Sequence, residues 1–168
     1  LCLFLVSCNN LDFVYKNNDD LKNPIYKKTT LYLSGVNIPS FYGQALKYLG
    51  EDEEMLYQLK ITTDEEKIKR SVESNQAISK LDYKIIFKYE LLDTKMGCFV
   101  FEKEIISRFT FEPKSSGQNF GSDQALNDLY ETAGKNNLQQ FIGYVSNDNL
   151  KFCINESWSN KDNIRAWL

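Results

Sequence analysis

Histidine is absent from the 168 residues of the chain. This absence excludes mechanisms that need an imidazole as general base, zinc ligand or pH switch near neutrality. Arginine is scarce as well, since it occurs only at Arg70, Arg108 and Arg165. Few side chains are therefore available to bind a phosphate in a bidentate manner. The net charge of −3 shows no excess of cations, which argues against a nucleic-acid partner.

Long hydrophobic runs are also lacking, and the most apolar stretch is the first eight residues. That stretch is too short to span a bilayer. Its last four residues, Leu5-Val6-Ser7-Cys8, resemble the lipobox of bacterial lipoproteins. The resemblance implies that residues 1–7 are part of a signal peptide, that cleavage precedes Cys8, and that the Cys8 thiol carries a lipid. The alternative interpretation is a short buried N-terminal strand.

A lipidated Cys8 would attach the protein to a membrane without spanning it. Each buried methylene contributes about 0.8 kcal/mol, so two or three acyl chains anchor a domain stably. Asn9 follows Cys8 where an aspartate would act as a retention signal, and by analogy with lipoprotein sorting this favours the outer membrane. We therefore expect an outer-membrane protein that faces the periplasm of a Gram-negative bacterium.

Two further cysteines, Cys98 and Cys153, would remain as thiols in the mature chain. An oxidising periplasm would allow them to pair, and a loop of that length contributes about 4 kcal/mol in the chain-entropy model. The alternative is two buried thiols that act as small hydrophobic side chains. Sequence spacing does not choose between these interpretations, because it carries no bridge geometry.

One folded domain is predicted over residues 29–146, after a polar tether over residues 8–28. A hydrophobic content of 42% and an aromatic content of 14% suffice for a sizeable core. A strand is predicted over residues 29–38, with a bulge at Gly35 that returns the following residues to the buried face. Ser40 then occupies the N-cap position of a helix that ends at Gly50.

The hydrophobic pattern has period two between residues 55 and 111. Apolar residues alternate with polar ones over 57–61, 81–91 and 99–111, which predicts antiparallel strands with one face covered and one facing water. Ser122 and Asp123 open a second helix over residues 122–146. Two helices on one face of a mostly antiparallel four-stranded sheet give an α+β two-layer sandwich in the order β-α-β-β-β-α. The tail, residues 147–168, has no assigned structure, although 150–154 could add an edge strand.

Charged clusters outside this pattern suggest little chemistry. The carboxylate runs 51–54 and 64–66 are interpreted as solvated, because neither lies among apolar neighbours. Lys67, Lys69 and Arg70 lie beside a predicted turn at 73–77 and could contact the phosphates of an anionic amphiphile, or simply form the wet face of the sheet. No catalytic constellation, metal site or cofactor site is predicted.

The order of the segments resembles the family of lipopolysaccharide-assembly lipoproteins called LptE. The resemblance rests on the lipobox, on Gly43-Gln44-Ala45-Leu46 after the first strand, on Leu56 to Ile61, on Tyr83 to Leu91, and on Phe109-Thr110-Phe111 before the last helix. It extends from Cys8 to about Ser146. Phe41 stands where the family commonly carries an arginine.

The resemblance implies a partner and a role, and it implies that the protein is not an enzyme. The protein would occupy the lumen of the outer-membrane β-barrel LptD, assist assembly of that barrel, and engage lipopolysaccharide on its way to the cell surface. An alternative from another class is a lipoprotein that serves as an auxiliary subunit of a transporter or as a module for a small ligand or lipid. That alternative would need an apolar pocket.

Overall fold

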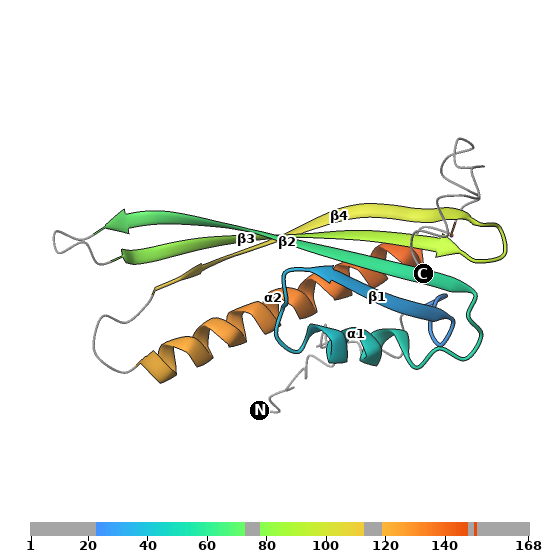
Figure 1. Ribbon diagram of the computed structural model, residues 1–168, viewed down its shortest axis with the longest axis horizontal. Helices are drawn as coiled ribbons and strands as arrows, with labels where there is room; N and C mark the ends of the chain where they lie inside the picture. Colours follow the sequence, from blue (N-terminus) through green and yellow to red (C-terminus); the bar gives the residue numbers. More distant parts are fainter. Residues whose placement is uncertain (1–22, 73–77, 113–118, 148–149, 151–168) are drawn as a thin grey trace, which may run out of the picture.

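The computed structural model describes residues 23–72, 78–112, 119–147 and Leu150. Its elements are, in chain order, β1 (Thr29–Gly35), α1 (Phe41–Leu49), β2 (Tyr57–Val72), β3 (Ile78–Asp93), β4 (Cys98–Phe111) and α2 (Asn119–Asn147). The observed order confirms the predicted β-α-β-β-β-α arrangement and the α+β class (Figure 1). Residues 1–22 and 151–168 lie outside the described residues, so the boundaries proposed for the signal peptide, tether and tail stay predictions.

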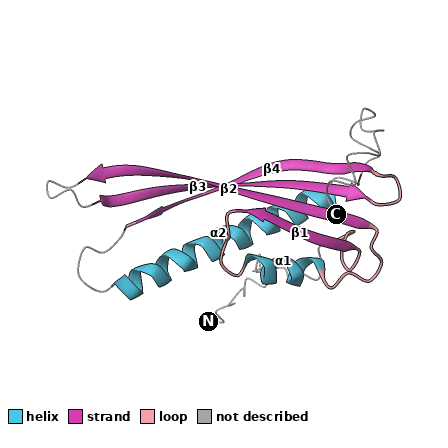
Figure 2. Ribbon diagram, in the orientation of Figure 1, coloured by secondary structure: helices cyan, strands magenta, loops and turns pink. Residues whose placement is uncertain are grey.

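The four strands form one sheet in the order β1-β2-β3-β4. The pairs β2–β3 and β3–β4 are antiparallel, whereas β1 runs parallel to β2. A parallel pair cannot be joined by a tight turn, and α1 provides the crossover that the geometry requires. Both helices lie on the same side of the sheet (Figure 2).

The strand register explains which side chains form the core. Leu31 and Leu33 of β1 are paired with Leu59 and Ile61 of β2, so alternation places all four on the face that the helices cover. The same face of β3 carries a buried set that consists of Tyr83, Ile85, Phe87, Tyr89 and Leu91. The predicted division into one covered and one open face is therefore confirmed.

The long helix α2 is fixed to the sheet by aromatic stacking and by one buried polar residue. The ring of Phe141 stacks on Tyr89 with a centroid separation of 4.3 Å and meets Phe101 edge-on at 5.5 Å. Asn137 is fully buried and accepts a hydrogen bond from the Tyr89 hydroxyl at 2.7 Å. Its amide donates to Ile105 O at 3.1 Å, so this side chain joins α2 to both β3 and β4.

The first strand ends earlier than the sequence predicts. The chain leaves the sheet at Gly35, whose φ of 93° lies in the left-handed region, and a Cβ at this position would lie 1.9 Å from Thr63 O. The predicted bulge is wrong, because Gly35 terminates β1 instead of returning the chain to it. Ile38 still becomes buried, but from the loop that follows the strand.

Helix α1 begins after Ser40 as predicted, whereas α2 begins earlier than predicted. Ser40 precedes α1 as expected, yet it has a φ of 60° and its side chain forms no capping hydrogen bond. Gly50 ends α1 as predicted, and its N–H donates to Leu46 O at 2.8 Å. Helix α2 starts at Asn119, so Ser122 lies within the helix and is not its N-cap.

Candidate functional site

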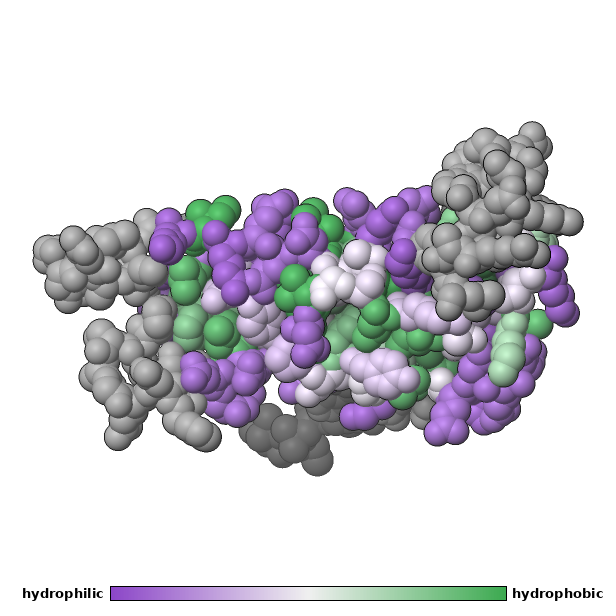
Figure 3. Space-filling model, in the orientation of Figure 1, coloured by the Kyte–Doolittle hydropathy of each residue, from purple (hydrophilic) through white to green (hydrophobic). Residues whose placement is uncertain are grey.

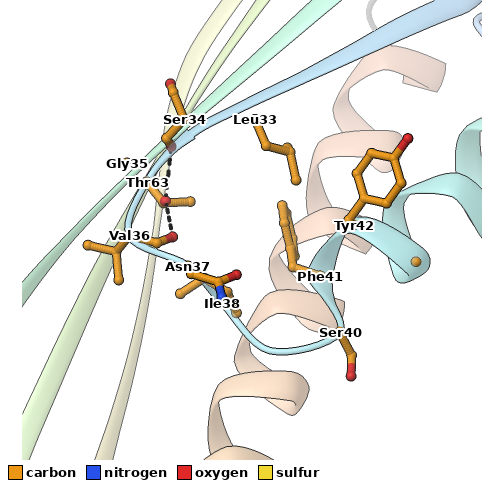
Figure 4. Close-up of a pocket in the computed structure, with 11 residues that line it drawn as sticks. Leu33, Ser34, Gly35, Val36, Asn37, Ile38, Ser40, Phe41, Tyr42 and Thr63 are labelled. Carbon is orange, nitrogen blue, oxygen red and sulfur yellow. Dashed lines mark hydrogen bonds between the residues drawn. The ribbon is translucent and has the colours of Figure 1, made fainter.

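A hollow opens between the end of β1 and the start of α1, and we call it the β1–α1 hollow. Its volume is about 280 Å³, and Leu33, Val36, Ile38, Phe41 and Tyr42 supply most of its apolar wall (Figure 4). Leu33 projects from the helix-covered face of β1 toward Phe41 and Tyr42 in this view. Lysine, arginine, carboxylate and thiol groups are absent from the residues that line it. The apolar wall of the hollow is suited to holding an apolar group.

The polar rim of the hollow fixes the loop that follows β1. Thr63, a buried residue of β2, has its hydroxyl 2.6 Å from Val36 O and 3.1 Å from Ser34 O. The N–H of Val36 donates to Thr63 O at 3.0 Å. These contacts hold the loop against β2 after Gly35 has turned the chain out of the sheet, so the hollow is preformed.

The segment that carries the family resemblance, Gly43 to Leu46, lies on α1. Gln44 and Ala45 are buried, and the Gln44 amide nitrogen lies 3.4 Å from Glu131 O on α2. Phe41, at the position where the family commonly has arginine, is a core residue whose ring lies 5.2 Å from that of Phe87. A Cβ on Gly134 would come within 2.9 Å of the Phe41 ring, so the phenylalanine fits against a glycine of α2.

The predicted phosphate-contact residues lie toward the far end of β2. Lys67 is paired in the ladder with Tyr83, a residue of the helix-covered face, so assigning Lys67 to the wet face of the sheet is wrong. Its ammonium lies 2.7 Å from Glu65 Oε1 and 5.4 Å from the centroid of the Tyr83 ring. Lys69 is exposed on the same strand, and the side chain of Arg70 lies outside the described residues. A phosphate role for these three residues stays a prediction.

The carboxylate run 64–66 is part of β2, and its middle member is not solvated. The Glu65 side chain is 8% exposed and accepts a hydrogen bond from the Tyr130 hydroxyl of α2 at 2.6 Å. Burial raises the pKa of Tyr130 to about 12. The Tyr130 ring meets Tyr83 and Phe109 edge-on, with centroid separations of 5.6 and 5.3 Å. The cluster therefore fastens α2 to β2, β3 and β4. Glu65 thus corrects the expectation that both carboxylate runs are fully hydrated.

The cysteine predictions are tested only in part. Cys98, at the start of β4, is disulfide-bonded. Its predicted partner Cys153 and the predicted lipidation site Cys8 both lie outside the described residues. The identity of the bridge and the lipid attachment therefore stay predictions.

Two broader properties complete the description of the site. Within the ranges that the structure describes, neither helix has the length and apolar character needed to cross a membrane. Across the same residues, Cys, Asp and Glu side chains nowhere gather in a group of three that could hold a metal ion.

The fold is one that occurs in bacterial lipoproteins. A candidate lipoprotein from Caulobacter crescentus superposes with a TM-score of 0.55 at 15% identity, over 71% of this chain and 88% of that one. Lipoprotein B from Nitrosomonas europaea superposes with a TM-score of 0.50 at 15% identity, over 72% of this chain and 86% of that one. No family model matches the sequence, and no curated protein matches it either. At this level of identity the likeness concerns the fold.

The β1–α1 hollow is the feature that sequence reasoning missed. The sequence predicts its lining residues as parts of a strand and a helix. Hydrophobic periodicity does not show that the chain leaves the sheet at Gly35. One signal was available: the sequence contains no charged residue from Thr29 to Leu46, its longest uncharged run.

Proposed function

We propose that this protein is a lipid-anchored outer-membrane lipoprotein of the LptE type. In this role it occupies the lumen of an LptD-like β-barrel, assists assembly of that barrel, and helps deliver lipopolysaccharide to the cell surface. It acts by binding and has no catalytic activity. Lys67, Lys69 and Arg70 are the proposed contacts for lipopolysaccharide phosphates.

The proposal is carried by one joint observation. Residues 5–8 resemble a lipobox that ends at Cys8, and the domain that follows has the fold found in the Caulobacter and Nitrosomonas lipoproteins. The segments that resemble LptE run in the predicted order, from Gly43 on α1 to the helix after Phe111. A shared fold alone assigns no function, so the lipobox and the order of motifs supply the remainder of the argument.

The open face of the sheet supports placement in a water-filled lumen. Lys88 lies 2.8 Å from Glu90 and 3.2 Å from Glu102, so neighbouring strands are joined by ion pairs on this face. Lys84 and Glu66 form a further pair at 3.0 Å. The interior of a large outer-membrane barrel is polar, and a face of this kind remains hydrated there. Figure 3 shows hydrophilic residues along the upper border of the view, above a centre of pale and hydrophobic residues.

Co-purification tests the proposal directly. The full-length tagged protein is extracted from membranes in mild detergent, and we expect a barrel protein to be recovered with it in equal molar amount. Cells depleted of the protein should lose surface lipopolysaccharide. Recovery of the lone domain together with normal barrel assembly and normal surface lipopolysaccharide would overturn the proposal.

The anchor has its own test. Cys8→Ser removes the thiol that would carry the lipid, so the variant should move from the membrane to the soluble periplasmic fraction. Cys2→Ser is the matched control, because Cys2 would leave with the signal peptide. Membrane retention of Cys8→Ser would contradict the lipobox interpretation.

The β1–α1 hollow favours a second candidate function, a module that binds a small ligand or lipid. At about 280 Å³ the hollow falls at the lower limit of ligand pockets, which favours a side chain or a short acyl segment over a whole lipid. Native mass spectrometry of the purified protein distinguishes the two functions. A stoichiometric small molecule that survives purification would support the second one.

A further inference from the structure

Among the described residues, the β1 edge of the sheet presents backbone groups that pair with no further strand. Ser34 O, in β1, and Val36 N–H, in the loop just after it, both face Thr63 of β2. Alternate residues of a strand direct their backbone groups to opposite sides, so the N–H and C=O of Leu31 and Leu33 point away from β2. Among the described residues, none forms a backbone hydrogen bond with these groups.

The two edges of the sheet differ in charge. Strand β4, at the opposite edge, carries Glu102, Lys103, Glu104 and Arg108. Charged side chains on an edge strand are a usual protection against pairing with other chains. Strand β1 lacks this protection, since the uncharged run from Thr29 to Leu46 covers the whole strand, the following loop and the first half of α1.

Apolar side chains are exposed along this same uncharged edge. Leu33 is 40% exposed, Val36 38% and Tyr42 56%, and all three line the β1–α1 hollow. A strand added beside β1 would direct alternate side chains toward the helix-covered face, where the hollow lies. The edge therefore combines backbone pairing groups with a place for one apolar side chain.

The chemistry of the edge distinguishes between possible occupants. An acyl chain would fill the hollow but would leave the N–H and C=O of Leu31 and Leu33 without partners, which is costly in an apolar environment. A second copy could pair β1 with β1. However, a ladder of 7 residues alone buries much less surface than a stable dimer requires. A polypeptide strand from a protein held at the same membrane satisfies the backbone groups and benefits from a high local concentration.

We propose that the free edge of β1 binds an extended, uncharged segment of the outer-membrane partner protein as a fifth strand, with one aliphatic or aromatic side chain in the β1–α1 hollow. This inference rests on the proposed function, because the barrel is the partner that supplies the segment. The inference assigns recognition of that partner to the β1 edge of this chain.

Photocrosslinking tests the contact in intact cells. A benzoyl-phenylalanine is placed at Leu33, and the matched control position is Ile106, which lies on β4 and is 39% exposed. We expect the Leu33 crosslink to map to an extended uncharged segment of the barrel protein. A crosslink to a second copy, to lipid, or within the same chain would overturn the proposal.

Substitutions at Leu33 separate side-chain from backbone recognition. Leu33→Glu places a charge in the contact and should lower barrel recovery by about tenfold, whereas Ile106→Glu should not. Leu33→Pro removes the outward N–H, and it should lower recovery further than Leu33→Ala if a strand is added. Thermal melting confirms that each variant is folded. If the proline variant is unfolded, the recovery of the barrel by Leu33→Glu alone tests the contact.

The outcomes separate this inference from the proposed function. If the wild-type protein recovers the barrel and Leu33→Glu recovers it equally well, the edge is not the recognition surface, while the proposed function stands. If the wild-type protein recovers no barrel, the proposed function fails and the inference fails with it.

Discussion

Replacing Asn137 with alanine should destabilise the fold more than any exposed change on α2. The Asn137 side chain is fully buried and takes part in three hydrogen bonds: it accepts from the Tyr89 hydroxyl and donates to Ile105 O and to Ser107 Oγ. Alanine would leave the Tyr89 hydroxyl without its acceptor and Ile105 O without this donor. Ser107 is less affected, because its hydroxyl also lies 3.3 Å from Ala133 O.

The size of the effect follows from these two orphaned groups. A buried donor or acceptor without a partner costs about 1–3 kcal/mol. Alanine is the better helix former by about half a kcal/mol, which offsets a small part of this loss. We therefore expect the free energy of unfolding to fall by about 3 kcal/mol, equivalent to a decrease in Tm of about 6–12 °C for a domain of this size.

Urea denaturation followed by circular dichroism measures this change, and the chain contains its own control. Asn136→Ala makes the same substitution one residue earlier, at an exposed position of α2. It should change the free energy of unfolding by less than about 0.5 kcal/mol. If Asn137→Ala costs no more than Asn136→Ala, the buried network does not hold α2 on the sheet and the reasoning is refuted.

Four further predictions test other parts of the structure. Burial raises the pKa of Tyr130 from 10.0 to about 12, so the unfolded chain loses this proton first and stability should fall between these pH values. Tyr130→Phe should reduce this loss of stability with rising pH, as measured by urea titrations at several high pH values. An unchanged pH dependence would contradict the assignment to Tyr130. Gly35→Ala should lower the free energy of unfolding by more than roughly 2 kcal/mol, because its Cβ would meet Thr63 O. Gly43→Ala, whose Cβ would meet open space, should not lower it, and chemical denaturation measures both variants. In unfolded, unreduced protein, peptide mapping should find Cys98 protected from a maleimide until a reductant is added, and immediate labelling would contradict the bridge. Lys69→Glu should weaken lipopolysaccharide binding in a pull-down, whereas Lys95→Glu, in the turn after β3, should leave it unchanged; equal effects would remove Lys69 from the contact.

The sheet was the most predictable part of the fold. Alternation over β3 is nearly perfect, because every second residue from Tyr83 to Leu91 must reach the core under the helices. The covered face follows from that pattern, and the element order needs the predicted helix ends as well. Strand β2 continues to Val72, next to the predicted turn at 73–77, through a charged stretch in which the apolar periodicity is weak. Its pairing with β3 maintains the strand there, which is a tertiary cause that a local pattern does not contain.

The candidate site was less predictable because it depends on close approaches between distant segments. Gly35 reads as a bulge in the sequence, and only the position of Thr63 O shows why the chain must turn away. Glu65 reads as one of three solvated carboxylates, and only the Tyr130 hydroxyl, supplied by α2, explains its burial. In both cases the deciding partner is far away in the sequence, and single-sequence patterns do not report such pairs.

The position of α2 at the end of the described chain has a kinetic consequence. The apolar face of β2, β3 and β4 is covered by a helix that is synthesised after all the strands. During synthesis from the N-terminus, the sheet therefore exposes its aromatic face until α2 emerges, and such surfaces aggregate readily. The interval before α2 docks is the period in which a chaperone would protect the protein, and slowing the release of α2 should increase its aggregation more than slowing the release of β1.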